Sequence, residues 1–213
     1  VAEKLFKHMQ ETGKKTIGFI GTGDTFGETW YKVAQDYADK YGVEIVANER
    51  FKRPDTSVTG QALKVLSAKP DAVLIAAPGG PAVLPQATLA DMGYKGTIYQ
   101  THGAALKEFI KLGGKKVEGT ILGGSLMLAP EDAPDSNPAK KVALEYISEY
   151  EKQYGEVPAT FGGNMYDAGL LLERAVPAAL KKGEPGTEAF RVALRDELEK
   201  VKDLAGTVSA YFG

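Results

Sequence analysis

The chain has 213 residues, of which 43% are hydrophobic and 25% are charged, and its formal net charge is −2. This composition is ordinary for a globular protein, and the scattered basic residues form no patch that would attract nucleic acid or an anionic membrane. Cysteine is absent, which excludes disulfides, thiolate catalysis and zinc–thiolate sites. No apolar run reaches the roughly 18 residues that a membrane span needs, so we expect no direct insertion into a membrane.

Both ends of the chain have the pattern of the inside of a structural element. Residues 1–7 form an amphipathic helical pattern and carry no signal peptide. Residues 206–213 resemble a strand that is just beginning. We therefore expect a piece of a longer protein, with any export signal outside these residues.

Five short apolar stretches are predicted to be strands, separated by helical patterns of about 10–15 residues. All six residues at 72–77 are apolar, which is typical of a buried parallel strand. Helices between consecutive strands indicate right-handed crossovers, so the predicted fold class is α/β with a Rossmann-like, doubly wound parallel sheet. The predicted strands are residues 17–20, 43–47, 72–77, 96–100 and 118–123.

Local signals place several helix ends. Gly42 is predicted to end the helix that follows the first strand, and Pro81 suits the first turn of a later helix. The Asp-Thr-Ser run at residues 55–57 offers candidate N-caps for a helix that begins near residue 58. His8 lies on the polar side of the first helix, where we expect it to face solvent.

The pattern changes after about residue 125. Residues 129–138 are acidic and proline-rich, which is typical of a linker or hinge. Three helical patterns with apolar faces follow, and Asn137 and Pro138 suit the start of the first one. These helices cannot close a core alone, so we expect them to need a sheet that the chain does not contain.

The most informative segment extends from Thr16 to Trp30, where an apolar strand enters a glycine-rich turn that opens onto a helix. Such a turn presents backbone N–H groups and the positive end of a helix dipole, which suits an anion. The spacing of Gly21, Gly23 and Gly27 departs from the dinucleotide-binding fingerprint, and no lysine follows Gly27 as a phosphate-binding loop requires. A nucleotide site is therefore disfavoured, and a turn that only connects strand to helix is the alternative.

Ligands of open parallel sheets bind outside the carboxyl ends of the strands, and three predicted turns occupy that edge. These turns offer backbone N–H groups, an aromatic face, a hydroxyl and an imidazole, which suit holding a small planar anion better than breaking bonds. The structural alternatives are packing for the aromatic ring, a bonded histidine and glycines that serve only the turn. The candidate ligand-binding residues of the three turns are Thr25, Phe26, Pro78, Gly79, Gly80, Thr101 and His102, beside Asp24.

Catalytic signals are few. His8 and His102 lie far apart in the sequence, and neither has a second histidine at ligand spacing, so a metal site is not expected. The segment around Ser125 lacks the second glycine of a G-x-S-x-G nucleophile turn. We predict no catalytic residue, no metal and no cofactor, and therefore no enzyme.

Six short motifs follow one another along the chain, at residues 15–20 (KTIGFI), 24–28 (DTFGE), 69–74 (KPDAVL), 92–94 (MGY), 113–120 (GGKKVEGT) and 164–168 (NMYDA). In this order they resemble the type I periplasmic solute-binding proteins, and among them the branched-chain amino acid receptor family of ABC importers. The resemblance covers essentially all of residues 1–213. In that family, two Rossmann-like lobes close around the ligand and the chain crosses between them three times.

The resemblance implies a domain organisation and a set of partners. Residues 1–126 correspond to most of the C-terminal lobe, residues 127–136 to a crossover, and residues 137–213 to helices of the N-terminal lobe, whose sheet is missing from the chain. The protein is then a periplasmic or otherwise extracytoplasmic receptor. Its implied partners are a small-molecule organic acid or amino acid, captured in an interlobe cleft, and the membrane permease of an ABC transporter.

Family ligand positions carry over one at a time. An aromatic position falls on Phe26, a turn falls on Pro78 and Gly79, and an aromatic position near the hinge falls on Phe161. The acidic position that pairs with the α-ammonium of an amino acid falls on His102, whose imidazole is neutral or positive near pH 7. Because an ammonium would lose its counter-charge there, we expect a non-amino-acid organic acid, with aromatic carboxylates favoured over branched-chain amino acids.

Two other functions are open at this point. The same fold serves as the effector-binding domain of transcription regulators and sensors, which would need a DNA-binding or signalling segment outside these residues. A dehydrogenase or kinase could use the glycine-rich turn for a nucleotide, although the glycine spacing disfavours it.

Overall fold

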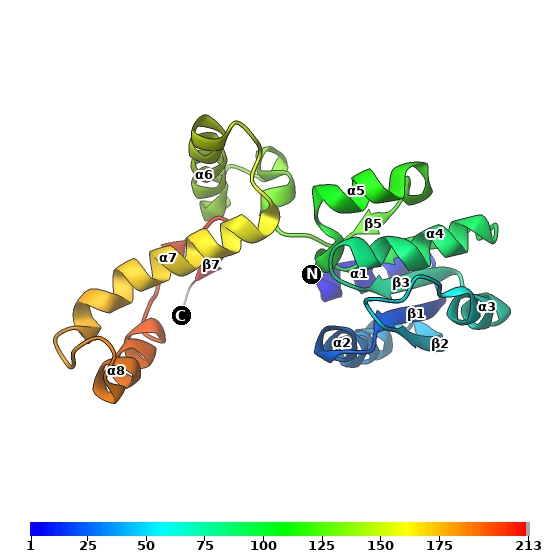
Figure 1. The fold of residues 1–213 in the computed structure, drawn as a ribbon, viewed down its shortest axis with the longest axis horizontal. Coiled ribbons are helices and arrows are strands. Elements are labelled where there is room, and N and C mark those ends of the chain that lie inside the picture. The colour runs from blue at the N-terminus through cyan, green and yellow to red at the C-terminus, as the bar shows by residue number, and fades with distance from the viewer. Residues whose placement is uncertain (212–213) are drawn as a thin grey trace. The chain divides into compact units, whose positions relative to one another are not determined.

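The computed structural model describes residues 1–211, which divide into two compact units. The first unit is Val1–Gly124, and the second begins at Ser125. Figure 1 shows the elements of both units as ribbons, coloured from blue through green in the first unit and from green to red in the second.

The first unit is built on a parallel sheet of five strands in the order β2-β1-β3-β4-β5. This order confirms the predicted α/β class and the doubly wound sheet. β2 is longer than its alternating pattern indicates, because it pairs with β1 as far as Phe51. β5 is shorter than predicted. The strands are β1 (Thr16–Thr22), β2 (Glu44–Phe51), β3 (Ala72–Ala76), β4 (Thr97–Gln100) and β5 (Ile121–Leu122).

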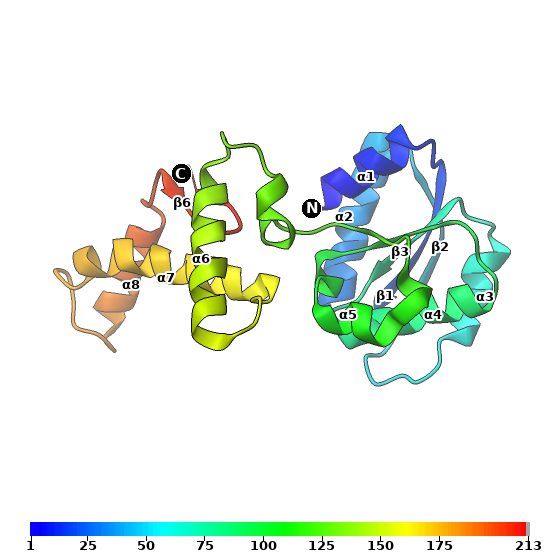
Figure 2. The same cartoon turned by 90° about the horizontal axis from the view of Figure 1, so that it is seen from above.

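Helices cover both faces of this sheet (Figures 1 and 2). Two helices pack on one face in a cluster of buried apolar side chains around Phe19, and three helices pack on the other in a cluster around Ile75. Every residue of β3 is buried, as predicted for a parallel strand covered on both sides. The helices are α1 (Ala2–Glu11) and α2 (Thr25–Tyr41) on the first face, and α3 (Thr59–Ser67), α4 (Val83–Asp91) and α5 (Lys107–Gly113) on the second.

In the first unit, two of the predicted helix ends are confirmed and one differs. Gly42 follows α2 in the left-handed conformation, with φ of 65°. Pro81 lies in the first turn of η1 (Gly80–Ala82), a 3-10 helix that leads directly into α4. The N-cap of α3 is Val58 rather than one of residues 55–57, although the hydroxyl of Ser57 accepts a hydrogen bond at 3.5 Å from the N–H of Thr59, the first residue of α3. The carboxylate of Asp55 instead accepts a hydrogen bond from the backbone N–H of Lys52, at 2.8 Å.

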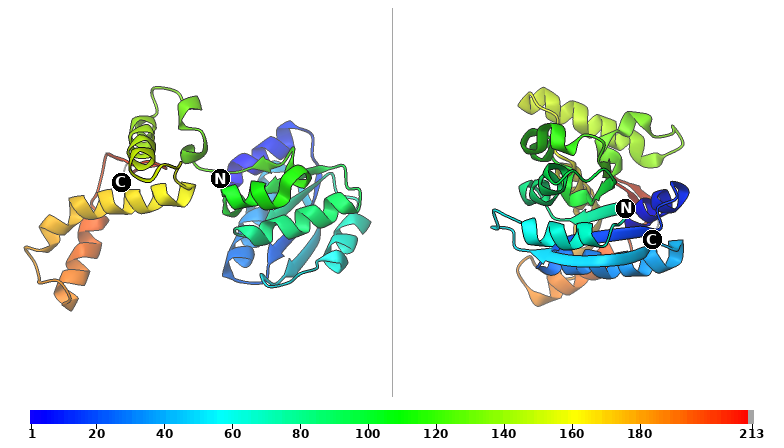
Figure 3. Two further views of the ribbon diagram at one scale, coloured as in Figure 1. Left: turned by 45° about the horizontal axis from the view of Figure 1, so that its top comes forward. Right: turned by 90° about the vertical axis from the view of Figure 1, so that its right-hand side faces the viewer.

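In the described part of the second unit, two 3-10 turns lead into three α-helices and a short antiparallel pair of strands. α8 lies beside the C-terminal half of α7 (Figures 1 and 3). Residues 206–211 are not the start of a single strand but belong to this hairpin, and residues 212–213 lie outside the described part. The elements are η4 (Leu126–Leu128), η5 (Pro130–Asp132), α6 (Pro138–Tyr154), α7 (Thr160–Ala179), α8 (Glu188–Leu198), β6 (Leu204–Ala205) and β7 (Ala210–Tyr211).

The segment predicted as a linker, residues 129–138, is more ordered than its composition indicates. It contains η5 and buries Pro130. Lys140 holds it from α6, because its Nζ donates to the carbonyl of Ala133 at 2.8 Å and pairs with Asp135 at 2.8 Å. Asn137 accepts a hydrogen bond from the N–H of Ala139 at 3.0 Å, which confirms the predicted start of α6.

The helices of the second unit bury small residues and expose large ones. Met165 and Leu172, which the helical pattern places on an inner face, are 73% and 43% exposed. Because these side chains gain little from burial, the unit has a thin core of its own. The buried residues of its α-helices are Ala139, Ala143, Thr160, Gly163, Asp167, Ala175, Ala179 and Ala193.

Asp167 is the buried acidic residue of the second unit, and it fastens the hairpin to α7. Its carboxylate accepts hydrogen bonds from the hydroxyl of Thr207 at 2.8 Å and from the N–H of Val208 at 3.1 Å, and it also bonds the N–H of Thr207. Gly206 must be glycine here, because a Cβ would lie 2.3 Å from this carboxylate. The motif at residues 164–168 therefore contains a structural aspartate.

Candidate functional site

The first unit places the predicted site at the point where its strand order reverses. β1 and β3 are neighbours in the sheet, and the chain leaves them toward opposite faces, to α2 and to η1 and α4. In open α/β sheets, this arrangement leaves a crevice outside the carboxyl ends of the two strands. The turns after β1, β3 and β4 lie at this edge, and we call them the carboxyl-edge turns.

The three carboxyl-edge turns contact one another. The N–H of Gly79 donates to the carbonyl of Gly103 at 2.8 Å, which joins the second turn to the third. The ring of Phe26, from the first turn, lies 5.7 Å from the ring of His102, centroid to centroid. A Cβ at Gly103 would lie 2.9 Å from the Phe26 ring and 3.0 Å from the Cα of Pro78, so only glycine allows this approach.

The start of α2 already holds a carboxylate of its own. Asp24 is the N-cap, and its side chain accepts hydrogen bonds from Gly27 N–H at 3.2 Å and from the hydroxyl of Thr22 at 2.8 Å. Arg53 pairs with the same carboxylate at 2.6 Å. Burial opposes ionisation, but these hydrogen bonds and the Arg53 charge hold the pKa of Asp24 below its ordinary value. The start of α2 is therefore not an open anion site, because the carboxylate of Asp24 already lies there.

His102 is half-buried among aromatic rings. Its ring centroid lies 5.7 Å from Trp30 as well as 5.7 Å from Phe26. Burial lowers the pKa of His102 below its ordinary value, because desolvation disfavours the charged form. Near pH 7 the imidazole is therefore neutral, and it can donate one hydrogen bond and accept another.

The other candidates differ in how accessible they are. Thr25 is exposed at the start of α2, and Pro78 and Gly80 are half-buried. Gly79 adopts φ of 64°, which favours glycine. Thr101 is fully buried, and its carbonyl accepts a hydrogen bond from the N–H of Ala104 at 3.0 Å, so its part in a ligand site remains a proposal.

Two leucines beside the second turn were not predicted. A Cβ at Gly79 would lie 4.0 Å from Cδ1 of Leu106, and a Cβ at Gly80 would lie 3.4 Å from Cδ1 of Leu112. Leu106 is half-buried, whereas Leu112 is 65% exposed. Leu106 therefore adds an aliphatic wall to the aromatic one. No local pattern marks these residues, because the contact depends on how α5 returns over the turn.

His8 is bonded rather than solvated, which corrects the prediction for it. Its Nδ1 lies 2.9 Å from the hydroxyl of Tyr99, a fully buried residue of β4, and the two rings meet edge to face. Among residues 1–211, no three His, Asp or Glu side chains come together as a metal site would require.

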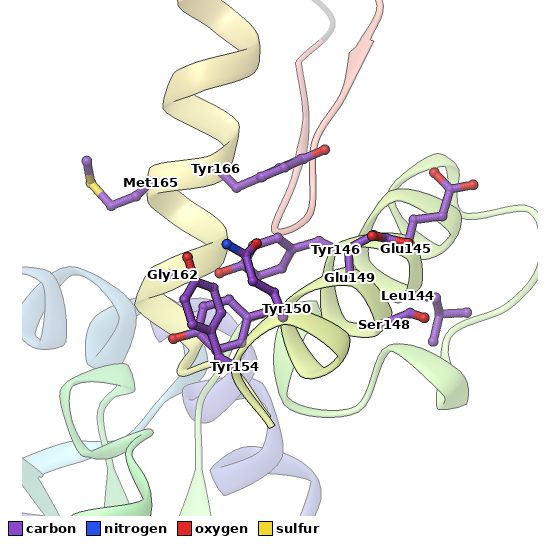
Figure 4. Close-up of a pocket in the computed structure, with 11 residues that line it drawn as sticks. Leu144, Glu145, Tyr146, Ser148, Glu149, Tyr150, Tyr154, Gly162, Met165 and Tyr166 are labelled. Atoms are coloured by element: carbon purple, nitrogen blue, oxygen red, sulfur yellow. The ribbon is translucent and has the colours of Figure 1, made fainter. Parts of the chain in front are cut away.

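Phe161, the remaining candidate, belongs to the second unit. It lies in the first turn of α7 and is 38% exposed, and its part in a ligand site is a proposal. The same unit carries a tyrosine-lined groove of about 920 Å³ between α6 and α7. Figure 4 shows Tyr146, Tyr150 and Tyr154 of α6 gathered there, with Met165 pointing away from them. Ring centroids are 4.9 Å apart for Tyr146 and Tyr166, and 4.6 Å apart for Tyr150 and Tyr154.

Comparisons with known proteins agree with this fold. A family model described as a periplasmic binding protein matches residues 1–211, so the chain belongs to the periplasmic binding protein family. This family is non-enzymatic, which agrees with the prediction that the chain is not an enzyme. Among curated proteins, none matches the chain. In the described residues, no helix is long and apolar enough to cross a membrane.

Solved structures of other proteins share this fold at higher and at lower sequence identity. Two extracellular ligand-binding receptors from Rhodopseudomonas palustris are 44% and 48% identical to the chain, with TM-scores of 0.93 and 0.89. In both cases 99% of this chain matches 59% of the receptor, so the chain spans about three fifths of their length. A leucine-binding protein from Thermotoga maritima is 21% identical, with a TM-score of 0.81, over 98% of this chain and 56% of that protein, and shares the fold.

Proposed function

We propose that the chain is the larger part of an extracytoplasmic solute-binding receptor that delivers a small organic acid to an ABC importer. Membership of the periplasmic binding protein family supports the receptor role, as do the Rhodopseudomonas palustris relatives described as extracellular ligand-binding receptors. More distant structures of the same fold are described as branched-chain amino acid ABC transporters, which supports a permease as partner. The periplasm is the proposed location.

In this proposal, residues 1–126 are most of the C-terminal lobe, and residues 137–213 are helices of the N-terminal lobe. The exposed apolar face of the second unit supports this assignment, because large side chains such as Met165 and Leu172 are expected to pack on a sheet. That sheet would come from the part of the receptor that this chain does not span.

The residues around His102 are the main support for the proposed class of ligand. The imidazole stands where family resemblance places a carboxylate, and the rings of Phe26 and Trp30 lie beside it. The nearby carboxylate of Asp24 is already bonded to Gly27 N–H and Arg53. An α-ammonium would lack a counter-charge, whereas an aromatic ring would find apolar walls and a carboxylate would find donors. We therefore favour an aromatic carboxylate, bound in an interlobe cleft with help from Phe161.

Titration calorimetry on the natural full-length protein tests this proposal. Benzoate and 4-hydroxybenzoate are expected to bind more tightly than leucine or valine. The variant His102→Asp would restore a carboxylate at this position, and it is expected to weaken benzoate and to strengthen leucine, each by about 10-fold or more.

A matched control is Ala68→Asp, which adds the same charge to an exposed residue after α3, at the opposite end of the sheet from the carboxyl-edge turns. It should leave both affinities unchanged. Leucine binding more tightly than the aromatic acids to the unmodified protein would rule out the ligand class but not the receptor role.

A further inference from the structure

Two buried glutamines lie directly beneath the second carboxyl-edge turn. Gln100 is the last residue of β4 and is fully buried, and Gln86 lies in α4 and is 1% exposed. Long polar side chains are rarely buried to this extent unless their hydrogen bonds are made inside the protein.

The side-chain amide of Gln100 ties the turn to the sheet. Its Nε2 donates to the carbonyl of Ala82, the last residue of η1, at 3.1 Å, and to Oε1 of Gln86 at 3.0 Å. The other end of the same turn is held by the bond from Gly79 N–H to the carbonyl of Gly103. The turn that contains Gly79 and Gly80 is therefore fastened at both ends.

Gln86 extends this hydrogen-bond network to the segment before β5. Its Nε2 donates to the hydroxyl oxygen of Thr120 at 2.6 Å and to the carbonyl of Lys116 at 3.2 Å. The hydroxyl of Thr120 in turn donates to the carbonyl of Val117 at 2.7 Å. The two amides thus form a continuous chain of hydrogen bonds from residues 116–120, through α4, to the turn after β3.

We propose that Gln100 and Gln86 are positioning residues that hold the turn at residues 78–82 in its ligand-binding geometry. They touch no ligand themselves. This inference rests on the proposed function, in which Pro78, Gly79 and Gly80 line the ligand site. Because preorganised donors bind a ligand without a reorganisation cost, loosening the turn lowers affinity although no ligand contact is removed.

The test uses nearly isosteric apolar variants in the natural full-length protein. Gln100→Met and Gln86→Met remove the amides with little change in volume, and Thr120→Val removes the hydroxyl farthest from the turn. Val73→Ala is the control, because it weakens the buried core of β3 and removes no hydrogen-bonding group.

Amide hydrogen exchange measures how firmly the turn at residues 78–82 is held, and it needs no ligand. The N–H of Ala82 donates to the carbonyl of Gly79 at 3.1 Å, so its exchange reports on the turn itself. Gln100→Met is expected to speed exchange at Gly79 and Ala82 about 10-fold while the amides of β1 stay protected. The core control Val73→Ala should speed exchange in β1 and the turn together. Equal acceleration of both regions by Gln100→Met would overturn the proposal, because it would show a merely structural role.

Affinity for benzoate provides the second measurement. Gln100→Met is expected to weaken binding about 10-fold, Gln86→Met about 3-fold, and Thr120→Val less than 2-fold, in the order of their distance from the turn. A loosened turn with unchanged affinity would overturn the proposal. If the unmodified protein binds none of the acids while Gln100→Met still loosens the turn selectively, the ligand class fails and the positioning role of the glutamines stands.

Discussion

The two units of this chain differ in which apolar side chains they bury. In the first unit, large residues such as Phe19 and Leu74 are fully buried between a sheet and two layers of helices. In the second unit, alanine and glycine fill the helix contacts, while Leu172 and Met165 face outward. Since burial of large apolar groups supplies most of the stabilisation of a domain, we expect the first unit to be the more stable of the two in this chain.

Matched leucine-to-alanine variants measure this contrast directly. In the 213-residue chain, Leu74→Ala in β3 is expected to destabilise the first unit by about 3–4 kcal/mol, because it leaves a cavity in a packed core. Leu172→Ala in α7, where the side chain is 43% exposed, is expected to cost less than about 1 kcal/mol. Urea unfolding followed by residue-resolved hydrogen exchange gives both values.

The same pair sharpens the domain assignment when it is repeated in the natural full-length protein. There, Leu172→Ala is expected to cost more than in the 213-residue chain, because the missing sheet would cover α7. Equal costs for Leu172→Ala in the two proteins would contradict the assignment of α7 to an N-terminal lobe.

In the second unit, one buried carboxylate, that of Asp167, holds the C-terminal hairpin, whereas the first unit is stabilised by its apolar core. Asp167→Ala leaves the N–H groups of Thr207 and Val208 without their acceptor and is expected to cost about 2–3 kcal/mol. Asp196→Ala is the control, because Asp196 is 43% exposed and pairs with Arg195 on the surface, and it should cost under about 0.5 kcal/mol. Faster hydrogen exchange confined to residues 204–210 is the expected signature. Unchanged protection there would show that the hairpin is held by other contacts.

Within the first unit, variants of the two leucines beside the second turn test which of them lines the ligand site. Leu106→Ala removes the half-buried wall near Gly79 and is expected to weaken benzoate by about 1 kcal/mol, or roughly 5-fold. Leu112→Ala, next to Gly80 but 65% exposed, should leave the affinity within about 2-fold. Calorimetric titrations of both variants make the comparison. The reverse order of effects would move the ligand site toward α5.

The smallest expected effect is a pH dependence that belongs to the first unit alone. Burial lowers the pKa of His102 from its ordinary 6.5, so the unfolded chain binds more protons than the folded one just below that pH. The stability that comes from keeping this imidazole neutral is therefore present above about pH 6.5 and is lost as the pH falls from there toward the lowered pKa of the folded state. Both histidines of the sequence, His8 and His102, lie in the first unit.

Unfolding free energies at pH 7.5 and pH 5.5 measure this effect. His102→Gln is expected to reduce the loss of stability of the first unit between these two values. An identical pH dependence with and without the imidazole would show that His102 does not carry the burial penalty.

The strands and their order were predictable, because apolar runs separated by amphipathic helices leave few other arrangements. The meeting of the three turns followed from the rule that parallel strands share a carboxyl edge. Side-chain bonding was less predictable. Asp55 is a strong N-cap candidate on composition, but the nearby Lys52 N–H offers it a turn bond instead.

Contacts between distant residues gave no signal in the sequence at all. His8 meets Tyr99 across 91 positions, and the Gln86–Gln100 pair depends on how α4 lies against β4. The occupied start of α2 is a different case. An aspartate three residues before Gly27 is a recognisable N-cap, and it indicates that this helix end supplies its own anion.

Trp30 is the sole tryptophan of the sequence, and its indole lies 5.7 Å from the imidazole of His102. In the 213-residue chain, emission excited at the red edge of protein absorbance therefore comes from a single place, beside His102. A protonated imidazole quenches indole emission, and a bound aromatic acid would change the polarity around both rings. These 213 residues thus carry an optical reporter of their own next to the candidate ligand-binding residues.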